Sequence, residues 1–273
     1  MRMTDRWSGV RRPVSDAGGG APGLLTAEAR RRLRLLNVII GLVLAAEGIL
    51  MLVLSSSLSL PVTASFLTGD PVAVQGPVAG QVLFRLAIGP AVAVFLLLAM
   101  ADHFLVAAPG IHHWYERALE KRANYARWIE YSVSASIMIV LIAMFTGIRD
   151  IAALLGLFAA NSAMILFGLL MERQQTVGRA DWSAYWFGCL IGAVPWLAIF
   201  WYVGGAPRVP TFVWVITGTQ LALFAAFAVN MALQYLRIGR WASYLTGERV
   251  YITLSLVAKS LLAWLIYVNV LRV

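Results

Sequence analysis

The sequence predicts an all-α membrane protein, a bundle of seven transmembrane helices. Of its 273 residues, 60% are hydrophobic and only 13% are charged, about half the charged fraction of soluble domains. The mean hydropathy is +0.78, and long apolar runs alternate with short arginine-rich segments. A spanning helix needs roughly 20 apolar residues, and seven runs are long enough: about 35–57, 84–108, 123–148, 150–171, 182–204, 209–236 and 248–271.

The N-terminal segment differs from the rest of the chain. The first 26 residues are rich in Gly, Pro, Arg and Asp and contain no apolar stretch of the kind found in a signal peptide. Such a composition favours disorder. We therefore expect a disordered cytoplasmic tail over residues 1–30 and a single seven-helix membrane domain over 31–273. The first apolar run is too long for a cleaved signal and should remain as an anchor.

The segment 58–80 lies between the first two apolar runs and contains LPVTASFLTGDPVAVQGPVAG. It combines Pro, Gly and β-branched residues, and Thr-Gly-Asp is typical of a turn. These features predict a β-hairpin-like loop outside the bilayer.

Basic residues are distributed unevenly between the two sides of the predicted bundle. One side would hold 17 Lys and Arg residues, in 1–34, 109–127, 172–181 and 237–249; the other would hold four, Arg85, Arg149, Arg208 and Arg272. Positively charged loops remain in the cytoplasm. We expect a multi-pass protein of the cell membrane with a cytoplasmic N-terminus and an extracellular C-terminus. The net charge of +9 then reflects topology, and we expect no nucleic-acid binding.

Few ionisable residues remain inside the predicted spans, away from their ends: Glu47, Asp102, His103, Glu130 and Lys259. A charge at the centre of a membrane helix costs about 2.5–3.5 kcal/mol. Each of these groups should therefore face the interior of the bundle and have a partner there.

Lys259 is unusual because 20 of the 22 basic residues are arginines. Arginine makes the better structural ion pair, whereas a lysine amine can form a Schiff base with a carbonyl compound. Glu130 could pair with Lys259, or with Arg127 three residues earlier on its own helix.

Aromatic and methionine residues in the neighbouring spans would supply a pocket for a flat apolar ligand. Seven helices, a buried lysine in the last and a carboxylate in the third indicate a retinal-binding protein.

The sequence also resembles the heliorhodopsin family over about residues 35–271. The similar stretches are RWIEYSVSASIMI (127–139), NSAMILFGLLME (161–172), NMALQY (230–235), SLVAKSLLAW (255–264) and the loop LPVTASFLTG. This resemblance implies all-trans retinal bound to Lys259, Glu130 as counter-ion, and a homodimer. It places Ser134 and Ser255 near the Schiff base. By position it also assigns pocket residues, namely Met138, Met164, Gly168, Trp186 and Phe224.

In the family, a polar cavity on the inner side is associated with movement of the Schiff-base proton. His103 matches a histidine of that cavity. Many members also have a histidine in the first helix, but the corresponding region here reads GLVLAAEGI, with Leu44 and then Glu47. We expect Glu47 either to substitute for that histidine or to form hydrogen bonds within the cavity.

The charged groups favour a light sensor over a transporter. Proton pumping needs an acceptor, a donor and a switch between them, yet Ser255 stands one turn before Lys259, and helix 3 has no acid beyond Glu130. The alternatives are a light-driven proton pump or channel, and a seven-helix transporter in which Glu130 and Lys259 form a structural pair.

His112 and His113 are adjacent and lack metal-ligand spacing, so we expect no metal site and no enzyme. A basic cytoplasmic face favours an acidic signalling partner or anionic lipid.

Overall fold

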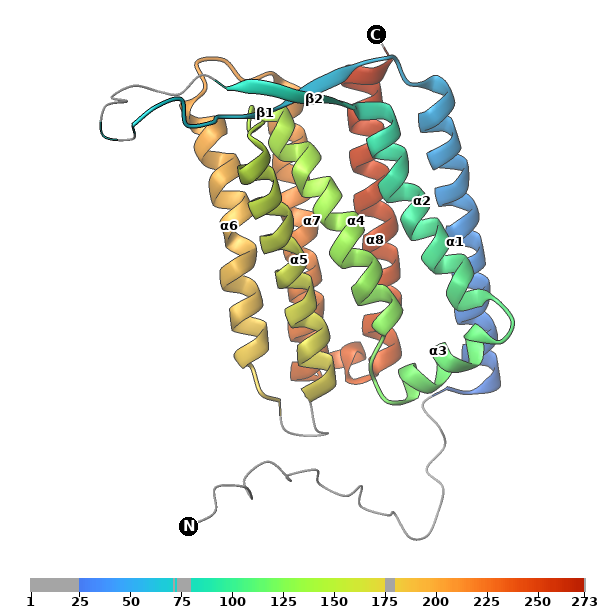
Figure 1. Ribbon diagram of the computed structural model, residues 1–273. Coiled ribbons are helices and arrows are strands. Elements are labelled where there is room, and N and C mark those ends of the chain that lie inside the picture. Colours follow the sequence, from blue (N-terminus) through green and yellow to red (C-terminus); the bar gives the residue numbers. More distant parts are fainter. Residues whose placement is uncertain (1–24, 71, 73–79, 175–179, 273) are drawn as a thin grey trace, which may run out of the picture.

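The computed structural model describes residues 25–70, 72, 80–174 and 180–272, and most of these are helical (Figure 1). Its elements are α1 (Ala27–Leu54), β1 (Ser59–Ala64), β2 (Gln81–Ala87), α2 (Ile88–Ala107), α3 (Ile111–Glu120), α4 (Tyr125–Phe145), α5 (Ile151–Gln174), α6 (Ser183–Gly205), α7 (Thr211–Leu236), a 3₁₀ turn (Gly239–Ala242), α8 (Tyr244–Ile266) and a π-helical turn (Tyr267–Leu271). Within the described residues, seven helices are long and apolar enough to cross a membrane, all except α3. The predicted seven-helix bundle is confirmed.

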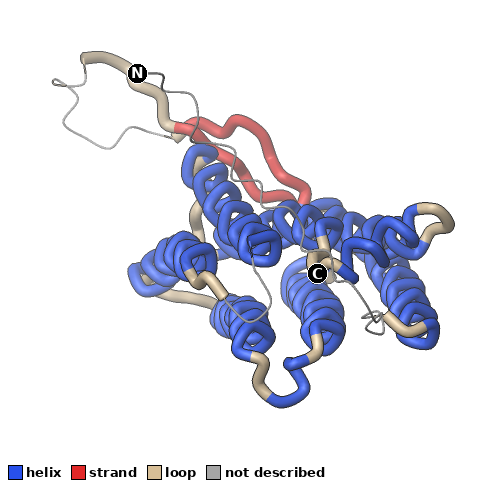
Figure 2. Tube along the Cα trace, turned by 90° about the horizontal axis from the view of Figure 1, so that it is seen from below, coloured by secondary structure: helices blue, strands red, loops and turns tan. Residues whose placement is uncertain are grey.

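The two ends of the bundle carry different structures. Helix α3 lies across one end, which we call the α3 end, and strands β1 and β2 lie across the other, the sheet end (Figure 1). Figure 2 looks along the helices from the α3 end and shows the strands to one side of the bundle. Helix α8 runs from the α3 end to the sheet end (Figure 1).

The predicted hairpin is present, but it extends further than expected. Strands β1 and β2 pair antiparallel, from Ser59 opposite Ala87 to Ala64 opposite Gln81, with an irregularity after Val62. Residues 84–87 were predicted to begin the second span, whereas the structure places them in β2 and begins α2 at Ile88. A short apolar run does not distinguish strand from helix. The predicted turn, residues 68–70, lies within the described residues and bends at Gly69, whereas residues 71 and 73–79 of the loop lie outside them.

Helix α3 was not predicted, because residues 109–127 were interpreted as a polar loop. Its buried residues include Tyr115 and Leu119, which gives a short helix one apolar face. Burial raises the pKa of the Tyr115 hydroxyl well above its usual value. His112 and His113 belong to this helix and not to a loop.

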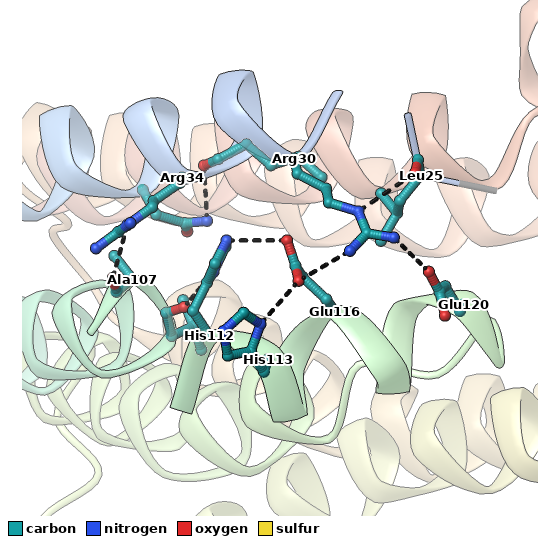
Figure 3. Close-up of polar contacts among 11 residues, drawn as sticks. Leu25, Arg30, Arg34, Ala107, His112, His113, Glu116 and Glu120 are labelled. Atoms are coloured by element: carbon teal, nitrogen blue, oxygen red, sulfur yellow. Dashed lines mark hydrogen bonds and ion pairs between the residues drawn. The ribbon is translucent and has the colours of Figure 1, made fainter. Parts of the chain in front are cut away.

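An ion cluster attaches α3 to the beginning of α1 (Figure 3). The Arg30 guanidinium lies 3.3 Å from Glu116 and 2.9 Å from Glu120. His112 Nε2 and His113 Nδ1 lie 3.1 and 3.5 Å from the carboxylate of Glu116. The polar residues of α3 therefore bind the helix to its neighbour.

Helix α1 begins within the segment predicted as a tail. The Thr26 hydroxyl accepts a hydrogen bond from the Ala29 amide at 3.2 Å and caps the first turn. The predicted disorder of residues 1–24 falls outside the described residues.

Candidate functional site

A cavity lies among helices α4, α5, α6, α7 and α8. Its volume is about 130 Å³. The wall is almost entirely apolar or aromatic, and its main polar groups are hydroxyls and one amine. The lining residues are Trp128, Tyr131, Ala135, Met138, Met164, Ile165, Gly168, Ala184, Tyr185, Gly188, Cys189, Phe224, Phe227, Ala228, Met231, Ser255, Ala258 and Lys259.

Lys259 provides the amine of this cavity. Only 3% of the residue is exposed. Its Nζ lies 3.2 Å from Glu130 Oε2 and donates a hydrogen bond to Ser255 Oγ at 2.7 Å. The same nitrogen lies 4.7 Å from the centre of the Tyr131 ring, close enough for a cation–π interaction. Side chains on a helix tilt toward its N-terminus, which explains why the amine meets Ser255, one turn earlier on α8.

The partner of Glu130 is Lys259 and not Arg127. Arg127 is buried and forms ion pairs with Glu172 and Glu248, whereas Lys259 forms the one ion pair found for Glu130 within the described residues. The second oxygen, Glu130 Oε1, is buried and accepts no hydrogen bond from a described residue. The carboxylate therefore acts on the amine through one oxygen and retains an unused acceptor.

The serines of α4 differ in role. Ser132 Oγ donates to the Ile129 carbonyl at 2.8 Å and Ser136 Oγ to the Ser132 carbonyl at 2.7 Å, as expected for hydroxyls inside a membrane helix. Ser134, expected near the Schiff base, is fully buried, and its hydroxyl bonds to no described residue. It is absent from the cavity wall, one turn beyond Glu130 on α4.

Most of the predicted pocket residues lie on the cavity wall: Met138, Met164, Gly168, Phe224 and Ser255. Trp186 does not. It is 63% exposed on the outer side of α6, and its neighbour Tyr185 faces the cavity instead. A shift of one residue rotates a helical side chain by about 100°, so the assignment of Trp186 to the pocket is corrected to Tyr185.

Glycines make room for the large side chains of the wall. A Cβ atom at Gly168 would lie 2.5 Å from the Trp128 ring, and one at Gly192 would lie 2.3 Å from Met164 Sδ. At both positions, the absence of a Cβ atom lets a bulky side chain pack directly against the helix backbone, which leaves more room in the cavity. An apolar cavity with a buried amine and a paired carboxylate has the chemical groups that a retinal Schiff base needs, so Lys259 and Glu130 are suited to hold that cofactor.

His103 and Glu47 were expected in one inner cavity, and the structure separates them. His103 Nδ1 lies 2.7 Å from Asn37 Oδ1, whereas Glu47 accepts hydrogen bonds from Ser260 Oγ at 2.7 Å and Trp264 Nε1 at 3.0 Å. Asn37 and Glu47 are about 15 Å apart along α1 at 1.5 Å per residue. Glu47 is therefore nearer the sheet end, and the expectation of a shared cavity is corrected.

The sequence analysis missed two groups of residues. Trp128 and Tyr131 line the cavity, and their spacing with Met138 on one face of α4 is a signal that could have identified them. The second group is the pairing of Arg127 with two glutamates. These partners come from α5 and α8, and no local spacing connects them.

Comparisons with known proteins concern the family and the fold of the chain. The family model described as Heliorhodopsin matches residues 33–271. No curated protein matches the sequence. Among solved structures, the chain is similar to the crystal structure of a light-driven proton pump, LR (Mac), from Leptosphaeria maculans. The two share 13% identity and a TM-score of 0.56, and the match covers 92% of this chain and 95% of the other. At this identity the similarity shows a common fold alone.

Proposed function

The chain belongs to the heliorhodopsin family of retinal rhodopsins, and on this basis we propose that it is a light sensor in which Lys259 binds all-trans retinal as a protonated Schiff base. The observation that carries the proposal is the contact of the buried Lys259 amine with Glu130 at 3.2 Å, at the wall of an apolar cavity. A structural ion pair alone does not require a cavity at that position.

Retinal bound at Lys259 would supply a light-sensitive polyene with a positively charged linkage. Glu130 stabilises that charge as counter-ion, because an opposite charge within about 4–6 Å favours the charged form. Ser255 accepts a hydrogen bond from the same nitrogen, and the Tyr131 ring faces it. Together these residues hold a cation that would otherwise be costly within the membrane.

His103 is the proposed proton acceptor at the α3 end. Asn37 Nδ2 donates to the Leu33 carbonyl at 2.9 Å, so Asn37 Oδ1 is the acceptor for His103 Nδ1–H. This assignment leaves His103 Nε2 as the basic atom of the neutral ring. Glu47 does not share this role, because its oxygens accept hydrogen bonds from Ser260 and Trp264.

A light-driven proton pump or channel is the second candidate. Glu47 favours it, because an acid nearer the sheet end than Lys259 could release protons. However, Ser260 and Trp264 lie about 100–140° around α8 from Lys259, on a different face from the cavity. Apart from Glu130, the side chain that bonds to the amine among the described residues is the Ser255 hydroxyl, which supports a sensor with little or no pumping. A non-retinal transporter with a structural Glu130–Lys259 pair is the third candidate.

We propose that the α3 end faces the cytoplasm, because the predicted loops on that side hold 17 of the 22 basic residues. The family resemblance supports a homodimer, and the basic surface supports an acidic signalling partner. No enzymatic activity is proposed.

One experiment separates these candidates. The full chain is expressed with all-trans retinal, and the visible absorption band is compared with that of Lys259→Ala. We expect a band that the substitution abolishes; no band in the natural protein would rule out the retinal proposal. Illuminated vesicles then distinguish sensor from pump, since a sustained, protonophore-sensitive change in external pH would show transport.

A further inference from the structure

A buried ion cluster lies between the cavity and the α3 end. Helix α4 supplies Arg127 and Trp128, and the residue that caps its N-terminus is Asn124. The other members are Glu172 on α5 and Glu248 on α8. Arg127 Nη2 lies 2.5 Å from Glu172 Oε1, and Arg127 Nη1 donates to Glu248 Oε2. Arg127, Glu172 and Glu248 are 3%, 5% and 0% exposed. The cluster therefore joins the ends of three helices that line the cavity.

The carboxylate oxygens of the cluster are all used. Asn124 donates its backbone amide to Glu172 Oε2 at 2.9 Å and its side-chain amide to Glu248 Oε1 at 2.5 Å. Trp128 Nε1 donates to Glu172 Oε2 at 2.7 Å. Two carboxylates face one guanidinium, so the neutral donors Asn124 and Trp128 stabilise the excess negative charge. Loss of one donor leaves a buried charge less well solvated, which is costly.

Trp128 belongs to both the cavity and the cluster. Its ring lines the cavity and packs against Gly168, while its N–H bonds to Glu172 one turn further along α5. The Arg127 guanidinium lies 4.6 Å from the centre of the same ring and 4.1 Å from that of Tyr251. The ring therefore cannot shift in response to a ligand without changing its contact with Arg127 or its bond to Glu172.

The edge of the cluster has unused hydrogen-bonding capacity. Arg127 Nε and the hydroxyls of Tyr244 and Tyr251 are buried and bond to no described residue. These groups offer a second set of partners when a bond of the cluster breaks. A network with two arrangements is what coupling between distant sites requires.

We propose that Trp128 couples the contents of the cavity to the Arg127–Glu172–Glu248 cluster, and that the cluster controls how tightly α4, α5 and α8 pack at the α3 end. Trp128 is a positioning residue in this scheme, because it acts through Glu172 and Arg127. The inference rests on the proposed function, since it takes retinal as the occupant of the cavity.

The coupling is tested by measuring hydrogen exchange of backbone amides. The chain is compared without and with retinal, and both measurements are made in the dark. The segments to follow are the first turns of α4 and α8 and the last turn of α5. In the natural chain we expect retinal to slow their exchange roughly fivefold or more, the lower end of typical coupling between sites. Trp128→Phe, which keeps an aromatic ring and removes the N–H, should abolish this difference. Trp264→Phe is the matched control, because Trp264 also donates its indole N–H to a carboxylate, Glu47, and it should retain the difference.

The outcomes separate the inference from the proposed function. Absence of a visible band in the natural chain overturns both. A band without any change in exchange, or a change that Trp128→Phe preserves, overturns the inference alone. If Trp128→Phe does not form pigment, Glu172→Gln decides. Glu172 is not part of the cavity wall, so loss of the retinal effect in that variant supports the coupling and its retention overturns it.

Discussion

Arg127 and Glu130 lie one turn apart on α4, and their side chains pair with different partners. Arg127 bonds to Glu172 and Glu248, and Glu130 bonds to Lys259. Two neighbouring charges of opposite sign thus serve two separate sites. The arginine cluster provides helix-to-helix attachment, and the Glu130 carboxylate remains available to the lysine.

Replacement of Glu130 by Gln should change the pigment without removing it. The carboxylate favours a positive charge on Lys259, so its loss should lower the pH at which half of the visible band disappears by about 1–3 units. The absorption maximum should also shift. Spectrophotometric titration measures both, with Glu120→Gln, an exposed position on α3, as the control. An unchanged colour and titration would exclude Glu130 as counter-ion.

Replacement of Arg127 by Gln should destabilise the protein strongly. Breaking a buried ion pair and leaving its partners unpaired costs about 3–5 kcal/mol. Arg30 is the matched control, because it also contacts two glutamates, Glu116 and Glu120, but its side chain is 40% exposed. Arg30→Gln should cost at most about 1 kcal/mol. Unfolding in detergent measures both free energies, and equal costs would contradict the assignment of the cluster as a buried network.

Replacement of Gly168 by Ala should disturb the pocket. The new methyl group would lie 2.5 Å from the Trp128 ring, and such overpacking costs about 1–3 kcal/mol. Gly156 on the same helix is the control, since a Cβ there has no neighbour within 4 Å among the described residues. Gly156→Ala should change stability by no more than about 1 kcal/mol. Thermal unfolding and retinal binding are the measurements. A neutral Gly168→Ala would contradict the close packing of Trp128.

His103 and Glu47 should respond differently to substitution. His103→Phe removes the proposed acceptor atom Nε2 and should slow the light-induced proton movement at least roughly tenfold, a modest effect for loss of an acid–base group. Glu47→Gln should leave that rate unchanged, because Glu47 bonds to Ser260 and Trp264. Time-resolved absorption after a flash measures the rates. A larger effect of Glu47→Gln would reverse the assignment and favour a pathway toward the sheet end.

The orientation of the bundle can be tested with single cysteines in a Cys189→Ser background. An impermeant maleimide added to intact cells should label Asp70→Cys, in the loop at the sheet end, and not Arg117→Cys on α3. Both residues are exposed. The reverse pattern would place the α3 end outside the cell.

The sequence was sufficient for the seven spans and for Lys259 and Glu130 as buried charges, since hydropathy and rare buried charges are local signals. It left open whether Glu130 pairs with Lys259 or with Arg127, and the structure shows Lys259 as the partner. Helix α3 was missed although Ile111, Tyr115 and Leu119 recur at helical spacing, because the polar residues of 109–127 were interpreted as a loop. The partners of Arg127 are a tertiary feature, because Glu172 and Glu248 lie on other helices. Trp186 shows a further limit, since its place differs from that of Tyr185 by one residue of helical rotation.

The cavity is formed by α4 to α8 alone, and its amine lies on α8, the last of the described helices. Because chains are synthesised from the N-terminus, α1, α2 and α3 can be assembled before any residue of the pocket exists. Covalent attachment of a cofactor to Lys259 must then wait until α8 has entered the bundle. Pigment colour would therefore report that membrane insertion is complete, and it could serve as a measure of correct biogenesis in living cells.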